Sequence, residues 1–182
     1  MRHITTPLTD EVAGQLRAGD HVCLSGVIYQ ARDAAHKRMV ALLERGEALP
    51  FELQGAVVYY MGPSPAPPGK VIGAAGPTTS GRMDAYTPLL LSHGLKAMIG
   101  KGSRSDAVKA AIREHKAVYL AATGGAGALL ARHIVRHEVI AWPELGAEAV
   151  ARLEVVDFPA VVVNDCHGGD LYIEGRARYE RA

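Results

Sequence analysis

Five side chains in the sequence are suited to binding a small dicarboxylate: Arg32, Thr78, Thr79, Arg82 and Lys101. Each lies near the end of a segment that we expect to be a strand. The three cations would neutralise carboxylate charge, and the two hydroxyls would donate hydrogen bonds. The set contains no redox centre, no strong electrophile and no obvious general base, because a free threonine is a very weak base that its surroundings must activate. The pattern therefore indicates one half of an active site.

Residues 76–82, Gly-Pro-Thr-Thr-Ser-Gly-Arg, combine three hydroxyls and one guanidinium at the expected start of a helix. Backbone N–H groups at a helix start attract anions, so this segment could form an anion pocket. A serine and threonine cluster that caps the helix, beside a solvated arginine, explains the same residues equally well. Both interpretations stay open at this point.

Arg32 precedes the helix predicted over residues 33–44, where a cation opposes the helix dipole. That position is understandable if Arg32 holds an anion that also faces the helix end, although pairing with Asp33 at the surface is the simpler interpretation. His36, one turn further, is typical of a packed or solvated histidine. Lys101 lies between two glycines at a strand end, where a ligand could approach the ammonium closely, and an ordinary turn lysine is the alternative.

Two other motifs favour structural roles. Residues 123–127, Thr-Gly-Gly-Ala-Gly, form a weak dinucleotide-binding pattern, but Leu130 replaces its third glycine, so a structural or substrate-side role is favoured over NAD binding. Residues 165–167, Asp-Cys-His, are better explained as part of a polar turn than as a metal site, because three adjacent ligands are sterically awkward. Cys23 lies within an apolar strand and is expected in the core.

Apolar segments of strand length alternate with helical patterns, which indicates an α/β architecture. The whole chain, residues 1–182, is expected to form one domain. The predicted strands are 21–28, 55–61, 71–76, 96–99, 117–122, 139–141, 151–156, 160–164 and 170–174. The predicted helices are 33–44, 81–93 with a break or kink at Pro88, 105–115, and 127 to about 137. Residues 62–69, rich in proline and glycine, are expected to be a stiff surface connection.

Composition excludes several classes of protein. Twenty lysines and arginines against nineteen aspartates and glutamates give a net charge of +1, which argues against a surface built for nucleic acid. Two cysteines exclude a disulfide framework and a four-cysteine zinc site. No apolar leader is visible, and the longest apolar run, residues 117–131, is too short and too rich in glycine to span a bilayer. We therefore expect a soluble, cytoplasmic protein with no membrane or nucleic-acid partner.

At these motifs the sequence resembles a known family, the β subunits and C-terminal domains of class I, iron–sulfur-dependent fumarate hydratases. This family is related to the β subunits of L(+)-tartrate dehydratases. The resemblance covers nearly the whole chain, and the order of ARDAAHKR, GPTTSGRMD and GKG carries it. In full, the matching segments are IYQARDAAHKR, VIGAAGPTTSGRMDAYTP, MIGKGSRS, ATGGAGALLA, and the stretch from LGAEAV through VNDCHGGDLY.

The resemblance implies a swivelling β/β/α domain with a mixed sheet and flanking helices. It also implies a partner α subunit that carries a [4Fe-4S] cluster on three cysteines, with one iron open as a Lewis acid; the two cysteines of this chain cannot hold such a cluster. Arg32, Thr78, Thr79, Arg82 and Lys101 would line a substrate pocket at the subunit interface, with Thr78 as the base that removes the C3 proton of malate.

The activity implied is the interconversion of fumarate and (S)-malate by a hydro-lyase that works only with its α subunit, assembled as a dimer of heterodimers. The isolated chain could also form a homodimer. The segments TTSGRMD and IYQARDAAHKRM look closer to fumarases than to tartrate dehydratases, and L(+)-tartrate and mesaconate remain alternative substrates. Two alternatives from other classes are a stand-alone nucleotide-binding α/β enzyme and a non-catalytic interaction module.

Overall fold

The computed structural model describes residues 1–180 of the chain. The strands are β1 (Arg2–Thr5), β2 (His21–Gln30), β3 (Val57–Tyr59), β4 (Ala97–Gly100), β5 (Val118–Ala121), β6 (Ile134–Ala141) and β7 (Val150–Asn164). The α-helices are α1 (Asp10–Gln15), α2 (Asp33–Glu44), α3 (Thr87–Ser92), α4 (Asp106–Glu114), α5 (Gly127–Ala131) and α6 (Leu171–Tyr179). Two 3-10 helices, η1 (Ser80–Met83) and η2 (Pro143–Glu148), complete the elements.

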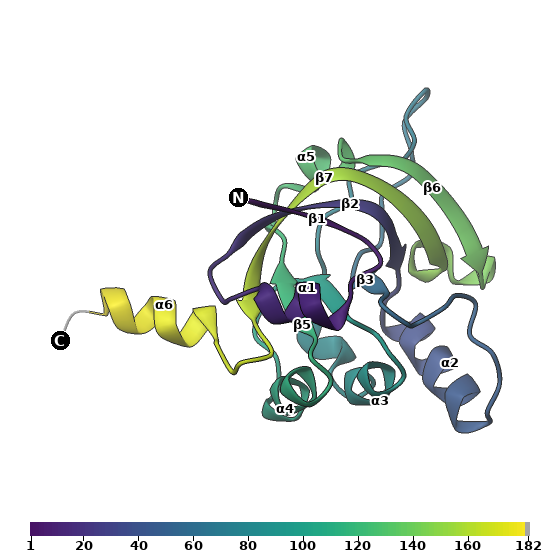
Figure 1. The fold of residues 1–182 in the computed structure, drawn as a ribbon. Helices are drawn as coiled ribbons and strands as arrows, with labels where there is room; N and C mark the ends of the chain where they lie inside the picture. Colours follow the sequence, from purple (N-terminus) through teal and green to yellow (C-terminus); the bar gives the residue numbers. More distant parts are fainter. Residues whose placement is uncertain (181–182) are drawn as a thin grey trace.

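The strands form a mixed sheet that closes on itself. Strands β1 to β5 pair in parallel, whereas β7 runs antiparallel to β2, β5 and β6. Because β7 pairs with both β2 and β5, the strands β2, β3, β4, β5 and β7 make a continuous ring of hydrogen-bonded neighbours. Helices α2, α3 and α4 lie on the outside of this ring, and the long curved strands β6 and β7 arch over the opposite side (Figure 1).

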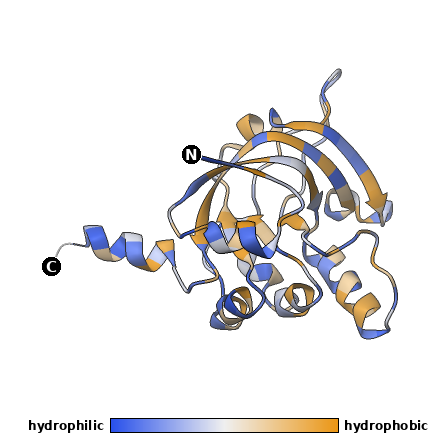
Figure 2. Cartoon of the chain, viewed as in Figure 1, coloured by the Kyte–Doolittle hydropathy of each residue, from blue (hydrophilic) through white to orange (hydrophobic). Residues whose placement is uncertain are grey.

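Strand side chains alternate between two apolar clusters, as the period of a β-strand requires. In β3, for example, Val57 and Tyr59 belong to a cluster shared by all five strands of the ring, whereas Val58 packs in a second cluster with residues of α2, α3 and α4. The first cluster fills the interior of the ring, and the second joins the ring to the helices. Hydrophobic and hydrophilic colours alternate along the long strands β6 and β7 (Figure 2), and helix α6, which has no buried residue, projects from the body (Figure 1).

The mixed α/β architecture with a sheet and flanking helices confirms the coarse fold prediction. Helix α2 has the bounds expected, and β4, α4 and β5 differ from their predicted ranges by one residue at each end. Residues 62–69 contain no helix or named strand, as their proline and glycine content predicted. The swivelling character of the domain stays a prediction. No helix in residues 1–180 is long and apolar enough to cross a membrane.

Two of the predicted strands are wrong. Residues 71–76 form no strand, because the amide of Ala75 donates to the Gly127 carbonyl (3.0 Å) and its carbonyl accepts from the Tyr59 hydroxyl (2.6 Å) instead of joining a ladder. Residues 170–174 begin helix α6, because the Asp170 carboxylate accepts from the amides of Tyr172 and Ile173 and so caps a helix.

Two helix predictions also need correction. The helix expected over 127–137 ends at Ala131, and β6 begins at Ile134, because this segment pairs with β7 and tertiary pairing outweighs local propensity. The helix expected over 81–93 is split into η1 and α3. Pro88 lies in the first turn of α3, where proline is tolerated, rather than kinking a longer helix. The predicted strands 151–156 and 160–164 are one strand, β7, and neither β1 nor α1 was predicted.

Candidate functional site

The predicted site residues gather at the carboxyl ends of three parallel strands. Arg32 follows β2, Lys101 follows β4, and Thr78 and Thr79 lie beside the end of β3, where Met61 bridges to Pro77. In α/β proteins, both open parallel sheets and closed barrels bind ligands at the edge formed by the carboxyl ends of the parallel strands. We call Arg32, Thr78, Thr79, Arg82 and Lys101, which the chain brings to this edge, the cationic edge.

Thr78, Thr79 and Lys101 are held together by backbone hydrogen bonds that extend the sheet. The Thr78 amide donates to the Tyr60 carbonyl (2.7 Å), and the Lys101 amide donates to the Thr78 carbonyl (3.3 Å). Thr79 and Lys101 also form an isolated parallel bridge. Thr79 and Lys101 are exposed and so form a solvent-accessible rim, and Thr78, next to them in the backbone, is half-buried.

Ser80, the third hydroxyl of the motif, does not reach this rim. Its side chain is buried, and its Oγ lies 2.8 Å from the hydroxyl of Tyr119. Burial raises the pKa of Tyr119, so this hydroxyl stays protonated and donates to the Gly102 carbonyl (2.8 Å). A Cβ at Gly100 would lie 2.0 Å from the Ser80 Oγ. Gly100 therefore makes room for Ser80 rather than for a ligand, which corrects the simplest interpretation of this glycine.

The two arginines of the edge are joined through carboxylates. Arg82 donates to Oδ2 of Asp33 from Nε (2.9 Å) and Nη2 (2.5 Å), whereas the Arg32 Nε lies 3.9 Å from Asp33 Oδ1. The closer partner of Arg32 is Glu148, at 3.0 Å from Nη2. The expected pairing of Arg32 with Asp33 is thus the weaker contact, and Glu148 was not foreseen. Within the part of the chain that the structure describes, the buried Nε of Arg32 has no hydrogen-bond partner.

Local packing fixes the direction of the Arg32 side chain. A Cβ at Gly62 would lie 2.8 Å from Nη1 of Arg32, so only a glycine lets the guanidinium lie across this backbone. The buried amide of Gln30 donates to the carbonyls of Ala147 (3.2 Å) and Ala149 (3.0 Å), on either side of Glu148. The end of β2 therefore holds both Arg32 and its carboxylate partner.

His36 supports the turn that carries Arg32. Its ring is fully buried against Tyr60 (ring centroids 5.3 Å apart), and its Nδ1 lies 2.7 Å from the Arg32 carbonyl. Burial lowers the pKa of His36 to about 4, so the imidazole is neutral near pH 7 and its Nδ1–H donates to that carbonyl. Of the packed and solvated histidines that the sequence left open, His36 is therefore the packed one, and it supports the backbone at Arg32.

A buried arginine that the sequence reasoning did not select lies beneath the loops of the edge. The side chain of Arg104 is fully buried, with Nε 2.7 Å from Asp84 and Nη2 2.8 Å from the Thr87 hydroxyl. Its guanidinium also lies against the rings of Tyr60 and Tyr119, at 5.3 and 5.0 Å from their centroids. These contacts tie the loop that carries the threonines to the loop that carries Lys101. The only sequence signal was the arginine that follows GKGS.

The glycine-rich loop, residues 123–127, lies beside Lys101. A Cβ at Gly124 would lie 4.0 Å from the Lys101 Nζ, and the Gly127 backbone packs directly on Gly76. Leu130, which replaces the third glycine of a dinucleotide motif, is buried in the interior of the ring. This position fits the structural or substrate-side role expected of the loop.

The cysteines do not form an iron–sulfur site within residues 1–180. Cys23 lies in β2 beside Met1, whereas Cys166 lies after β7 near the Ala13 carbonyl. Asp165 accepts hydrogen bonds from three backbone amides, which confirms the polar turn predicted over 165–167. Burial raises the pKa of the Asp165 carboxyl, but these amides outweigh it and hold the pKa below its usual value. The described side chains therefore fit no cluster that needs three cysteines.

Comparison with known proteins gives a consistent result. The model of a protein family described as "Fumarase C-terminus" matches residues 2–175. The chain is 42% identical to "Fumarate hydratase 2" of Leishmania major over 168 residues, and 41% identical to "Fumarate hydratase class I, anaerobic" of Escherichia coli K12 over 160 residues. These alignments cover 90% and 87% of the chain but 30% and 29% of the two relatives, so the chain spans about a third of their length.

A relative of similar length has a different name. The chain is 37% identical to "Putative L(+)-tartrate dehydratase subunit beta" of Methanocaldococcus jannaschii over 180 residues. That alignment covers 96% of this chain and 92% of the relative.

Proposed function

Because the chain belongs to the fumarase C-terminus family, whose relatives are hydro-lyases, we propose that it is the β subunit of a two-chain enzyme that interconverts fumarate and (S)-malate. The observation that carries the proposal is the cationic edge, where three cations and two threonines meet at the carboxyl ends of parallel strands. The relative named as a β subunit, which the chain matches along almost its whole length, supports the two-chain arrangement.

In this proposal the cations bind and stabilise the substrate. Removal of the C3 proton, next to a carboxylate, builds an aci-carboxylate dianion, and fixed guanidinium and ammonium groups are suited to stabilise that charge. Arg32, Arg82 and Lys101 take this role, and the hydroxyl of Thr79 orients the substrate. Thr78 accepts the C3 proton. A threonine hydroxyl needs activation for this, and we assign that activation to groups of the partner chain.

The charges around the edge support the need for a partner. Asp33 and Glu148 already pair with the two arginines, so one positive charge is left in excess, against two negative charges on a dicarboxylate. The start of α2, where Arg32 is the N-cap and makes no side-chain cap, adds only a partial positive charge. The missing positive charge and the electrophile would come from an α subunit, on which we also place the [4Fe-4S] cluster that this chain's residues do not fit.

Reconstitution tests the proposal. The isolated chain should show no hydration of fumarate, and mixing it with an anaerobically prepared, cluster-bearing α subunit should produce (S)-malate. Co-purification from the native host, with an iron assay, should recover the same pair of chains. Full activity of this chain alone, or an α subunit whose activity does not change when the chain is added, would refute the division of labour.

A second substrate is favoured by one specific observation, the length match to the putative tartrate dehydratase β subunit. The reconstituted enzyme should therefore be assayed with fumarate, L(+)-tartrate and mesaconate in parallel. We expect the highest kcat/KM with fumarate. A higher value with tartrate would move the assignment to a tartrate dehydratase and leave the roles of the cationic edge unchanged.

A further inference from the structure

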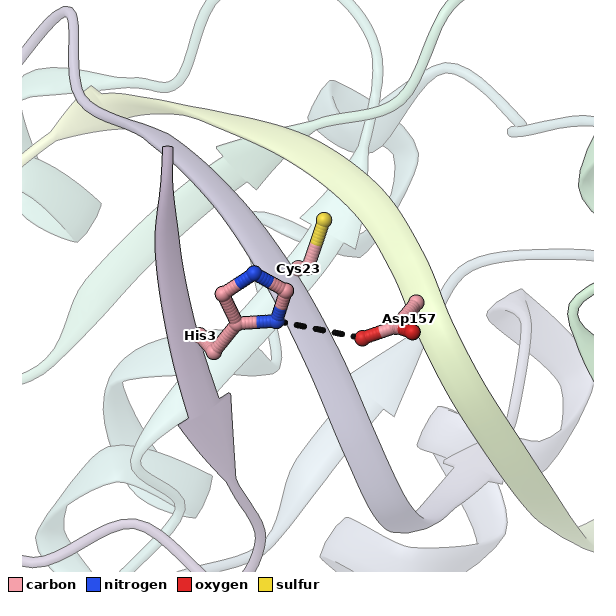
Figure 3. Close-up of side chains that lie close together, drawn as sticks. All are labelled: His3, Cys23 and Asp157. Atoms are coloured by element: carbon pink, nitrogen blue, oxygen red, sulfur yellow. Dashed lines mark hydrogen bonds and ion pairs between the residues drawn. The ribbon is translucent and has the colours of Figure 1, made fainter.

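Three metal-ligating side chains meet at the end of β2 that lies far from Arg32. They are His3 of β1, Cys23 of β2 and Asp157 of β7, and their ligand atoms all lie within 4.8 Å of one another (Figure 3). The His3 Nδ1 is 3.1 Å from the Asp157 Oδ1. In residues 1–180 no other group of three or more histidines, cysteines or carboxylates comes this close together. We call these three residues the three-donor cluster.

Strand register brings the cluster together. His3 is the direct partner of Cys23 in the parallel pairing of β1 with β2, and β7 flanks β2 on its other side. The pairing of β2 with β7 shifts between Leu24 and Gly26, which places Asp157 in a β-bulge. Asp157 has φ +49, a conformation that aspartate and asparagine tolerate better than most residues. Bulges re-aim side chains, and this one turns the carboxylate across β2 towards His3.

The surroundings of the cluster suit a bound cation. The neighbours of Cys23 in β2, Val22 and Leu24, belong to the interior of the ring, so the thiol points to the outer face. The thiol is covered by Met1, whose Sδ lies 3.1 Å from the Cys23 Sγ. His3 and Asp157 are more than half exposed, with side-chain exposures of 71% and 55%. One side of the cluster is therefore closed by protein, and the other is open to an ion from solvent.

The donor types select a class of metal. One imidazole nitrogen, one thiol and one carboxylate make a borderline-soft set that suits Zn²⁺, whereas Mg²⁺ and Ca²⁺ prefer oxygen ligands alone. Around a tetrahedral zinc, ligand atoms lie about 3.3 to 3.7 Å apart, given metal–ligand distances of about 2.0 to 2.3 Å. The observed 3.1 Å between nitrogen and oxygen is close to this range, and the sulfur lies within 4.8 Å of both atoms.

We propose that His3, Cys23 and Asp157 bind one zinc-like divalent cation, with water in the fourth position, and that this ion fastens β1 to the ring. β1 has four residues and pairs with β2 alone among the described strands, so a link to both β2 and β7 would strengthen its attachment. Arg32 lies nine positions after Cys23 in the chain, which corresponds to about 30 Å of extended backbone. The cluster is thus independent of the cationic edge, and the proposal does not rest on the proposed function.

Titration of the full chain, reduced and without a histidine tag, tests the proposal with Co²⁺ and Zn²⁺ as probes. We expect one Co²⁺ per chain, with intense visible bands of a tetrahedral site and a thiolate-to-metal charge-transfer band, both lost when Zn²⁺ displaces Co²⁺. Saturating Zn²⁺ should raise the Tm, because an ion that binds only the folded chain stabilises it. C23S should abolish the charge-transfer band, and H3Q and D157N should weaken affinity by more than about tenfold.

Matched controls decide the interpretation. H21Q changes an exposed histidine of the same strand, and C166S changes the other cysteine, so both should retain wild-type binding. Absence of a thiolate band in the wild type, survival of the band in C23S, or its loss in C166S would each overturn the proposal. If C23S fails to fold, D157N carries the test, since asparagine suits the backbone conformation there. Unchanged affinity in D157N would then overturn the three-ligand site.

Discussion

The two ends of β2 carry two different kinds of polar cluster. At its carboxyl end, Arg32 pairs with the carboxylates of Asp33 and Glu148 at the start of α2, and its side chain packs across the Gly62 backbone. At its amino-terminal end, Cys23 meets His3 and Asp157 across two strand pairings, and two of the three side chains are exposed. The first cluster attracts anions, and the second offers ligands to a cation. One strand can therefore serve two chemistries because its ends lie far apart.

The largest effect is expected from removal of the Thr78 hydroxyl at the cationic edge. In the reconstituted enzyme, T78V should lower kcat by about 10² to 10⁴, the range usual for loss of a general base. T78S, which keeps a hydroxyl, should retain much more activity. T79V, beside it, should raise KM more than it lowers kcat. Steady-state kinetics with (S)-malate measure all three, and a T78V enzyme with near-normal kcat would remove Thr78 from the role of base.

Loss of the Arg32 guanidinium should have the next largest effect. R32A should lower kcat/KM for fumarate by about 10² to 10³, because a charge-assisted donor to the substrate or to the developing dianion is lost. The fold should persist, since Arg32 lies at the rim of the site and its ion pair is with a partly exposed carboxylate. Kinetics should be measured at saturating α subunit, with a separate binding assay for the α subunit. Unchanged kinetics would exclude Arg32 from the site.

Arg104 and Arg82 give a matched comparison of stability. Both pair with an aspartate, but the Arg104 side chain is fully buried whereas that of Arg82 is 47% exposed. R104M should lower the free energy of unfolding by about 3 kcal/mol, because it removes a fully buried cation from the partly buried carboxylate of Asp84 and from the Thr87 hydroxyl. R82M should cost less than about 1 kcal/mol. Urea denaturation of the isolated chain measures both. Equal losses would show that Arg104 does not hold the two loops together.

His36 should make stability depend on pH. Its pKa is lowered from 6.5 to about 4 in the folded chain, so between these values the unfolded state binds more protons and stability falls as the pH falls. The full stabilising effect is present above pH 6.5, and the loss by pH 4 is about 3 kcal/mol from this group. Urea midpoints across this range should show a shallower pH slope in H36N than in the wild type. Identical slopes would contradict the assignment.

The smallest effects are expected when a residue at one end of β2 is changed and the function of the other end is measured. D157N should change kcat/KM of the reconstituted enzyme by less than about twofold, since distant sites act independently. R32A should leave Co²⁺ affinity unchanged. A large loss of activity in D157N would show that the three-donor cluster affects the cationic edge, which would contradict the independence of the two ends of β2.

The features predicted from sequence are those in which nearby residues decide the outcome. The start of α2 after Arg32 follows from an apolar period of three and four, and Lys101 is marked by its flanking glycines. Glu148 could not be foreseen, because Gln30 and the packing of η2 bring it to Arg32 from a distant part of the chain. The same holds for His3 and Asp157, which are 154 residues apart and meet only through strand register.

The errors in secondary structure have the same origin. Residues 134–137 continue a helical pattern, yet they become part of β6 because they pair with β7. Residues 71–76 look like a strand, yet the Ala75 carbonyl accepts from the Tyr59 hydroxyl and the Ala75 amide donates to the Gly127 carbonyl, so these groups are not available for pairing with another strand. In both cases a partner far along the chain decided the conformation, and local propensity did not.

The closure of the ring by β7 has a consequence for how the chain is made. During synthesis, β2 and β5 emerge well before residues 150–164, so each keeps one row of amides and carbonyls without its final partner until β7 arrives. Such open rows invite pairing with other chains. A nascent polypeptide stalled before Val150 would thus be the form most prone to aggregate, and protection by a chaperone matters most during that interval.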